Sequence, residues 1–202
     1  MLDDAGERPG RPAATTRAEL EQVALELFAE RGFVATTVDD IAAAAGIGRR
    51  TFFRYFASKN DVVWGDFELG LLALRARLAT VQPGRPLLDE LREAVLAFNR
   101  FDPGEVPWHR DRMALILTVP ALQAHSTLRY AAWRSVIAEF AAARLGGSPA
   151  DLLPQLVGHS CLGAALTAYD QWLLRPGSDL PLLLDQAMRA LSGSWAGASG
   201  PP

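Results

Sequence analysis

Apolar and polar residues recur along this chain with the period of helices. From Leu20 to Phe28 the apolar positions fall three and four residues apart, which places them on one face of a helix. Thr16 followed by Glu19 is the capping-box pattern that starts a helix, and Gly32 after the last turn is typical of a helix end. The first predicted helix therefore lies between Thr16 and Gly32.

The same signals delimit three more helices before residue 82. Thr37 with Asp40 starts a short helix, and Ser58 with Asp61 starts a longer one. Between these two starts, the glycine-containing stretch AGIG interrupts the apolar pattern, so a separate short helix follows it. The three predicted helices are 38–45, 49–56 and 58–81.

Proline and glycine divide the rest of the chain into apolar segments with helical spacing. The clearest breaks are Pro83-Gly84, Pro103-Gly104, Gly146-Gly147 and Pro176-Gly177. No segment shows a convincing strand pattern, so the chain is predicted to be all-α, with nine helices. The five helices predicted in this part are 86–101, 107–118, 121–145, 149–174 and 180–192.

The composition changes near residue 80, at the end of a predicted helix that connects a compact N-terminal unit with a larger helical body. A compact three-helix domain is expected at 15–60 and a larger helical body at 61–192. The first 14 residues hold several prolines and glycines and few apolar groups. We therefore expect a disordered arm at 1–14, and a disordered tail at 193–202.

Composition excludes several classes of protein. Half of the 202 residues are hydrophobic and the net charge is −3, so the chain can bury a core. Cys161 is the single cysteine, which excludes an internal disulfide framework and a cysteine-based zinc site. No apolar run reaches about 18 residues and the N-terminus lacks a signal peptide, so we expect a cytoplasmic protein without a membrane span. No GxSxG, GxGxxG or metal-binding histidine pattern is present, so we expect no catalytic residue, no cofactor and no metal.

The helix predicted at 49–56 combines arginines with aromatic rings in the stretch GIGRRTFFRYF. Projected at 100° per residue, Phe52 and Phe56 share one side, while the arginines occupy another arc together with Phe53. Residues 41–60 contain four basic and no acidic groups, whereas the rest of the chain has 16 basic and 23 acidic groups. Two short helices joined by a glycine turn form a helix-turn-helix, whose second helix can enter a major groove. A solvated face is the alternative, but DNA binding also explains the exposed aromatic ring.

The stretch TTVDDIAAAAGIGRRTFFRYFASKNDVV resembles the N-terminal signature of the TetR family of transcriptional repressors, and the match covers residues 15–63. This resemblance implies a nine-helix fold, with an N-terminal helix-turn-helix domain and a C-terminal domain for ligand binding and dimerisation. A homodimer would bind palindromic operator DNA, because two recognition helices about one DNA turn apart read two half-sites.

The family's DNA contacts are transferred by position. Thr37 matches a residue that contacts phosphate at a helix N-terminus, and Lys59 matches the phosphate-binding lysine. Arg49, Arg50 and Thr51 match the base-reading positions. The full predicted set of DNA-binding residues is Thr37, Gly48, Arg49, Arg50, Thr51, Phe53, Arg54, Tyr55 and Lys59.

Two of these positions depart from the family pattern. Phe53 and Tyr55 match aromatic residues that face the DNA backbone, but Phe53 stands where tyrosine is usual, so a hydroxyl contact is lost. Gly48 stands where serine or threonine commonly caps the recognition helix, so one phosphate contact is absent.

The whole chain, including VPALQAHSTLRYAAWRSVIAEF, also resembles the subgroup of mycofactocin-system transcriptional regulators. This resemblance implies control of genes for a peptide-derived redox cofactor. It also implies that the inducer is a fatty acyl-CoA.

An apolar effector is expected to bind among the segments between residues 86 and 174. For each candidate residue, a core or surface position is the alternative. Arg112 and Arg129 become informative if both point into one cavity, where they would meet a carboxylate or a phosphate. The predicted ligand-binding residues are Asn99, Arg112, Met113, Leu117, Arg129, Trp133, Ile137 and Trp172.

The last two predicted helices are the candidate dimer interface. One side of the helix at 149–174 carries Gly158, Cys161, Ala165, Ala168 and Tyr169. The small residues among them let helices approach closely. The alternative is that these residues belong to the core of a single chain.

The sequence favours a ligand-responsive repressor that is not an enzyme. An apolar ligand would favour the form whose recognition helices are wrongly spaced, and the helix at 58–81 would transmit that choice. The alternative is a small-molecule-binding protein for a lipid or an acyl-CoA, whose N-terminal domain does not bind DNA specifically.

Overall fold

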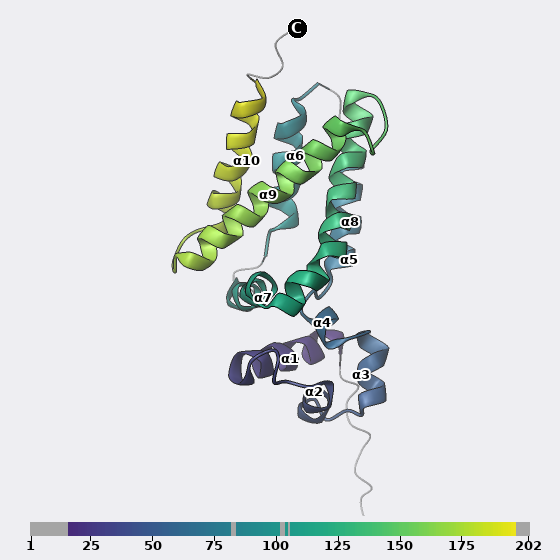
Figure 1. Ribbon diagram of the computed structural model, residues 1–202, viewed down its shortest axis with the longest axis vertical. Coiled ribbons are helices and arrows are strands. Elements are labelled where there is room, and N and C mark those ends of the chain that lie inside the picture. The colour runs from purple at the N-terminus through teal and green to yellow at the C-terminus, as the bar shows by residue number, and fades with distance from the viewer. Residues whose placement is uncertain (1–15, 82–83, 102–103, 105, 197–202) are drawn as a thin grey trace, which may run out of the picture. The chain divides into compact units, whose positions relative to one another are not determined.

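The computed structural model describes residues 16–81, 84–101, 104 and 106–196 (Figure 1). Within these residues the chain forms ten helices and no strand, so the all-α prediction is confirmed. The predicted arm at 1–14 and residues 197–202 of the predicted tail lie outside the described residues. The helices are α1 (Arg17–Arg31), α2 (Val38–Ala44), α3 (Arg49–Tyr55), α4 (Lys59–Val62), α5 (Phe67–Ala79), α6 (Leu87–Phe98), α7 (Val106–Thr118), α8 (Pro120–Leu145), α9 (Leu152–Leu174) and α10 (Leu180–Ala196).

The predicted count of nine helices is wrong because the single helix expected at 58–81 is two helices, α4 and α5. Between them the backbone of Gly65 has a φ of +50°, which a right-handed helix cannot include. The side chains of Val63 and Trp64 are buried in this connection. Because the hydrophobic spacing continues through Gly65, the sequence pattern did not reveal the break between α4 and α5. At the other end of the chain, α10 runs to Ala196 and includes the first four residues of the predicted tail.

The chain separates into two compact units, Met1–Val62 and Val63–Pro202. In the first unit, the capping boxes predicted at Thr16 and Thr37 are both present. Each threonine side chain accepts a hydrogen bond from the backbone of the third helical residue, whose carboxylate accepts one from the threonine backbone. Gly32 ends α1 with a φ of +81°. These local signals fix where α1 and α2 begin and how α1 ends.

The core of the first unit is formed by apolar side chains of α1, α2 and α3. Leu20, Ile41 and Phe52 are completely buried. Phe28 and Phe56 are also buried, and the rings of Phe52 and Phe56 lie 5.8 Å apart between centroids. Three helices that are each too short to be stable alone are held together by this cluster.

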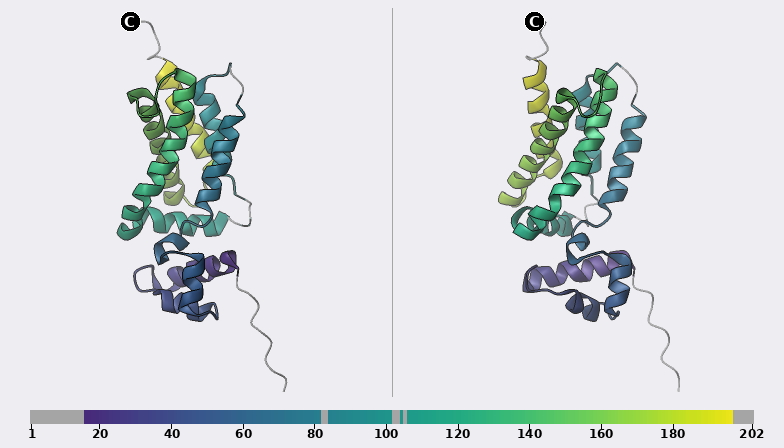
Figure 2. Two further views of the ribbon diagram at one scale, coloured as in Figure 1. Left: turned by 90° about the vertical axis from the view of Figure 1, so that its right-hand side faces the viewer. Right: turned by 45° about the vertical axis from the view of Figure 1, so that its right-hand side comes forward.

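The second unit is a bundle in which α8 and α9 make the most extensive contact and α10 packs on α9 (Figure 2). Gly158 of α9 favours a close approach at this crossing, because a Cβ there would lie only 3.0 Å from the carbonyl oxygen of Arg134. Cys161 and Ala165, on the same side of α9, are buried within the chain. The small residues proposed for the dimer interface are therefore core residues of this unit, which was the alternative.

Large apolar side chains are exposed elsewhere on α9 and α10. Leu152 and Leu174 at the two ends of α9 are 80% and 72% exposed. Leu153, Leu156 and Leu182 are also exposed.

In the part of the chain that the structure describes, none of the helices is sufficiently long and apolar to cross a membrane.

Candidate nucleic-acid interface and ligand cavity

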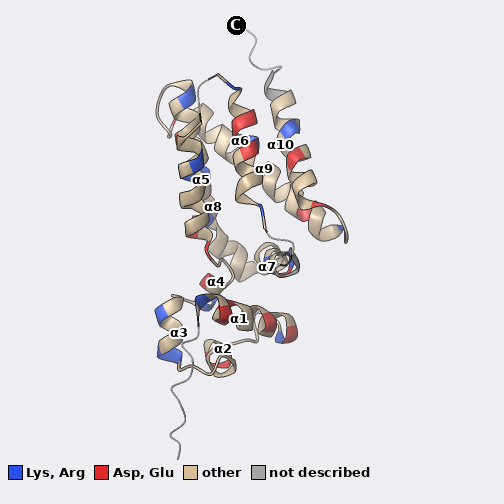
Figure 3. Ribbon diagram, turned by 180° about the vertical axis from the view of Figure 1, so that it is seen from behind, with Lys and Arg blue, Asp and Glu red and all other residues tan. Residues whose placement is uncertain are grey.

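Helix α3 has two faces of opposite character. Phe52 and Phe56 point into the first unit, whereas Arg50, Phe53 and Arg54 are exposed. Figure 3 shows basic residues on α3 and acidic residues on α1 and α2. The predicted division of this helix into a buried aromatic side and an exposed basic side is confirmed by its geometry. Its contacts with DNA remain a prediction.

The three arginines of α3 have different surroundings. Arg49 Nη1 donates a hydrogen bond to Asp39 Oδ2 at 2.7 Å, and the guanidinium carbon lies 5.4 Å from the ring centre of Phe53. Arg50 and Arg54 make no hydrogen bond or ion pair with the described residues. Two of the three arginines are thus available to a ligand, and the third is held by an acidic neighbour.

The two ends of α3 are held differently. Gly48 at the N-terminus makes no side-chain capping bond. At the other end, Arg17 Nη1 donates to the carbonyl oxygen of Tyr55 at 2.7 Å, and its guanidinium lies 4.3 Å from the ring centre of Phe56. Sequence reasoning missed Arg17, since nothing in the local pattern connects the start of α1 with the end of α3. Thr51 lies in the first turn of α3 and is partly exposed.

The two predicted phosphate contacts are engaged within the protein. The hydroxyl of Thr37 donates to Asp40 Oδ2 at 2.6 Å, and hydrogen bonds from Thr37 lower the pKa of the Asp40 carboxyl. Lys59 Nζ donates to the carbonyl oxygens of Phe33 and Thr36, both at 2.7 Å. Partial burial lowers the pKa of the Lys59 ammonium group. A phosphate would have to replace Asp40 at Thr37, whereas at Lys59 it could accept the remaining N–H.

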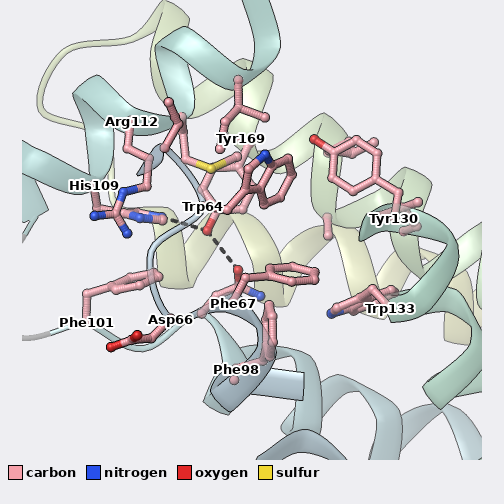
Figure 4. A pocket seen from close by; sticks show the side chains of 18 residues that line it. Trp64, Asp66, Phe67, Phe98, Phe101, His109, Arg112, Tyr130, Trp133 and Tyr169 are labelled. Atoms are coloured by element: carbon pink, nitrogen blue, oxygen red, sulfur yellow. Dashed lines mark hydrogen bonds between the residues drawn. The ribbon is translucent and has the colours of Figure 1, made fainter. Parts of the chain in front are cut away.

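A cavity of about 240 Å³ lies within the second unit (Figure 4). Aromatic and aliphatic side chains form most of its wall, which favours an apolar occupant. The lining residues are Val63, Trp64, Asp66, Phe67, Gly70, Phe98, Asn99, Phe101, His109, Arg112, Met113, Ile116, Tyr130, Trp133, Leu162, Ala165, Leu166 and Tyr169.

One part of the wall carries a buried chain of hydrogen bonds. The hydroxyl of Tyr169 donates to Asn99 Oδ1 at 2.7 Å and lies 2.8 Å from His109 Nε2 (Figure 4). Asn99 Nδ2 in turn donates to the carbonyl oxygen of Val95 at 2.8 Å. Because the Tyr169 proton is directed to Asn99, Nε2 of His109 must be the donor to Tyr169. The chain of bonds therefore fixes the tautomer of His109.

Burial determines the charge of this region. It lowers the pKa of His109 to about 4, so the imidazole is neutral at pH 7. It also raises the pKa of the Tyr169 hydroxyl and lowers that of the Arg112 guanidinium. The ring of Phe101 stacks on His109 with 3.6 Å between ring centres. The cavity thus has a neutral hydrogen-bonding group and a guanidinium in an otherwise apolar wall.

The structure brings four of the eight predicted ligand-binding residues to the cavity: Asn99, Arg112, Met113 and Trp133. Leu117 is not part of the wall, and Ile137 is completely buried in the core. Trp172 packs behind the wall, with its ring 5.9 Å from that of His109. The guanidinium of Arg129 lies 5.2 Å from the ring of Trp64, and Nη1 is 3.3 Å from the Glu68 carboxylate. Arg112 and Arg129 therefore do not share the cavity.

The prediction omitted most of the aromatic wall. Trp64 and Phe67 fall in the segment that was read as one continuous helix, and Tyr169 was assigned to the dimer interface. Helical spacing identifies residues that face inward, but it does not distinguish those that face a cavity from those that face another side chain. Within the described residues, no group of three or more His, Cys, Asp or Glu side chains could hold a metal ion.

Comparison with known proteins relates both units to transcriptional regulators. The family model of bacterial regulatory proteins of the tetR family matches residues 22–63, and that of the MftR C-terminal domain matches residues 85–196. MftR of Mycobacterium tuberculosis, whose name assigns it to the regulation of mycofactocin biosynthesis, is 52% identical over 82% of this chain and 84% of its own length. The transcriptional regulator TcmR of Streptomyces glaucescens is 33% identical over 92% of this chain and 88% of its own.

A solved structure supports the same relationship. The TetR-family repressor FadR of Thermus thermophilus, in complex with lauroyl-CoA, superposes with a TM-score of 0.56. Its sequence is 26% identical, and the match covers 88% of this chain and 93% of that one.

Proposed function

The chain belongs to the tetR family of bacterial regulatory proteins, and from that membership we propose that it is a homodimeric repressor released from palindromic operator DNA by an apolar effector. One observation carries the proposal: the same chain has a helix with exposed arginines and an aromatic-lined cavity. The first would bind DNA and the second would bind the signal.

DNA binding is assigned to α3. Arg50 and Arg54 have no partner among the described residues, so their guanidinium groups can donate to phosphates or to guanine edges without breaking an existing bond. Phe53, 44% exposed, can pack on a sugar or on a thymine methyl group. Thr37, Tyr55 and Lys59 are proposed to contact the DNA backbone.

The cavity supports an effector with an apolar body. Its volume of about 240 Å³ is below the 300–1,000 Å³ of most ligand sites. An acyl segment of that size would fit, whereas a coenzyme A portion would remain outside and a long chain would require the cavity to widen. The lauroyl-CoA complex of FadR makes a long-chain acyl-CoA the first effector to test.

Dimerisation is assigned to α9 and α10. The exposed leucines at positions 152, 153, 156, 174 and 182 form apolar surface that a second copy would cover. Two copies are also what a palindromic operator requires. Because MftR is related over most of the chain, we propose a mycofactocin-related operon as the target.

Effector and DNA would compete through a population shift. If the effector prefers a form of the dimer whose recognition helices do not match the half-site spacing, it must weaken DNA binding by the same factor by which DNA weakens effector binding. This reciprocity distinguishes a regulator from a protein that only carries a small molecule.

The test is fluorescence anisotropy with duplex DNA from upstream of the protein's own gene. A dimer with roughly 6–10 phosphate contacts should lose about 10³–10⁵ in affinity between 50 and 200 mM salt. Lauroyl-CoA should weaken binding further, and Arg50→Ala should reduce the preference for this DNA over a scrambled duplex. Effector binding without salt-dependent DNA binding would instead favour a small-molecule-binding protein.

A further inference from the structure

Asp39 is an acidic residue beside the basic face of α3. It lies in the first turn of α2, and its Oδ2 accepts a hydrogen bond from Arg49 Nη1 at 2.7 Å. The side chains of Asp39 and Arg49 are 66% and 58% exposed. The only other charged groups that α3 carries are Arg50 and Arg54, so this pair is the point at which a carboxylate meets the arginines of α3.

Asp39 favours the first turn of α2 through the helix dipole, but this effect does not require the contact with Arg49. The ion pair itself contributes little to stability, because water and salt screen both exposed charges. Near DNA, a carboxylate is repelled by phosphates and also reduces the positive charge that attracts them. The remaining effect of the contact is to orient the guanidinium group of Arg49.

The contact determines which edge of Arg49 is available. A guanidinium group has two edges that can donate a pair of parallel hydrogen bonds, and Nη1 belongs to one of them. With Nη1 bonded to Asp39, the edge formed by Nε and Nη2 has no hydrogen bond to a described residue. That edge matches the O6 and N7 acceptors of guanine. The ring of Phe53 lies 5.4 Å from the guanidinium carbon and limits its movement on another side.

We propose that Asp39 is a specificity-determining residue of the DNA interface, which positions Arg49 for a guanine edge and keeps it from the phosphates. This inference rests on the proposed function, since it presumes that α3 reads DNA. Arg50 and Arg54 lack such a restraint and can turn to phosphates as well as to base edges. Asp39 thus lowers the affinity for unrelated DNA and increases the difference in affinity between the preferred sequence and other sequences.

The inference predicts opposite effects on two kinds of DNA. When Asp39 is neutralised, Arg49 can turn to a phosphate, so binding to unrelated DNA should become tighter. Binding to the preferred sequence should weaken about twofold, because the oriented contact with guanine is lost. Asp39→Asn keeps the size of the side chain and removes its charge.

The test compares two probes. One is the duplex that the wild-type protein enriches from a random-sequence library, and the other is a scrambled duplex of equal length. Anisotropy titrations over a salt series should show Asp39→Asn binding the scrambled duplex about fivefold more tightly. Its salt dependence should steepen by about one phosphate contact per protomer, and the ratio of the two affinities should fall by about tenfold.

Two further variants separate positioning from a general effect of charge. Glu30→Gln removes one negative charge from α1, where Glu30 is exposed and has no bond to a described residue. It should change both affinities by the same small factor. Arg49→Ala should relax selection from the random library at particular base pairs, and Asp39→Asn should relax selection at those same base pairs. In the Arg49→Ala background, Asp39→Asn should no longer alter discrimination.

Equal changes on both duplexes for Asp39→Asn, as for Glu30→Gln, would overturn the role of Asp39 and leave the regulator proposal intact. Relaxed selection at base pairs unrelated to those of Arg49→Ala would overturn it as well. If the wild-type protein enriches no sequence from the library, the regulator proposal fails, and the inference about Asp39 fails with it. A melting curve by circular dichroism confirms that each variant is folded before it is titrated.

Discussion

Helix α3 and the wall of the cavity both bring polar and aromatic side chains together, but the polar groups are exposed on α3 and buried at the cavity. On α3 the aromatic rings of Phe52 and Phe56 are buried and the arginines face water. In the cavity the rings form the wall, and His109 and Tyr169 are buried among them. A buried polar group must be hydrogen-bonded, whereas an exposed one need not be, so the two regions follow different rules.

The largest effect is expected from Phe52→Ala. Phe52 is completely buried and its ring contacts those of Phe53 and Phe56, at 5.4 and 5.8 Å between centroids. Removing it should cost about 3–5 kcal/mol, because transfer energy is lost and a cavity remains. Phe53→Ala, on the exposed side of the same helix, should cost under about 1 kcal/mol. Urea unfolding followed by circular dichroism measures both, and equal costs would contradict the two-sided structure of α3.

The next effect concerns pH and belongs to the cavity alone. In the folded protein the pKa of His109 is about 4, whereas an unfolded chain has the ordinary value of about 6.5. Between these values the unfolded state binds a proton that the folded state does not, so stability falls as pH falls from 6.5 to 4. The loss should approach about 3 kcal/mol at pH 4 and be absent above pH 7.

His109→Gln is the reference for this effect, since other groups also titrate in the same range. Unfolding is followed by tryptophan fluorescence, which reports on the second unit because all five tryptophans lie at or beyond residue 64. The wild-type protein should lose more stability on acidification than the variant. Parallel pH profiles for the two proteins would show that the imidazole is not held neutral by burial.

A smaller effect is expected when the chain of hydrogen bonds is interrupted. Tyr169→Phe removes the hydroxyl between His109 Nε2 and Asn99 Oδ1, and leaves both buried atoms without that partner. The expected cost is about 2 kcal/mol in urea unfolding. Met113→Leu, a change of similar volume in the apolar wall, should cost about 1 kcal/mol or less. If Tyr169→Phe is no less stable than Met113→Leu, the buried hydrogen bonds of Tyr169 do not contribute to the stability of the second unit.

The two regions also differed in how far the sequence predicted them. A short amphipathic helix must bury one face, so the spacing of Phe52 and Phe56 was enough to place the arginines of α3 outside. The capping residues Thr16 and Thr37 were readable because capping is a local interaction. Within the bundle, an apolar inward position has the same spacing whether it meets a side chain or a void, so the sequence pattern did not distinguish Ile137 from Met113. Their different environments depend on the packing of several helices.

Interactions between distant residues were not visible either. The bonds of Arg17 to Tyr55 and of Tyr169 to Asn99 connect residues 38 and 70 positions apart. The break between α4 and α5 was missed for a related reason, since one glycine with positive φ, Gly65, is enough to end a helix without altering the apolar pattern. Local chemistry was therefore predicted well, and the cavity only in part.

The smallest effect tests the uncapped start of α3. Gly48 has a φ of −80°, in a region open to any residue, and a Cβ there would meet no atom within 4 Å. Gly48→Ser should therefore add a side-chain cap and stabilise the protein by a few tenths of a kcal/mol. Gly46→Ser is the matched control: its space is equally open, but its φ is +65°, so the same substitution should cost about 1 kcal/mol. Because the new serine hydroxyl lies at a helix N-terminus on the candidate DNA surface, Gly48→Ser should also tighten binding to the preferred and scrambled duplexes by the same small factor. The slope of affinity against salt should stay the same, because the hydroxyl carries no charge. A stabilised variant with unchanged affinity for both duplexes would mean that the start of α3 does not approach the DNA backbone.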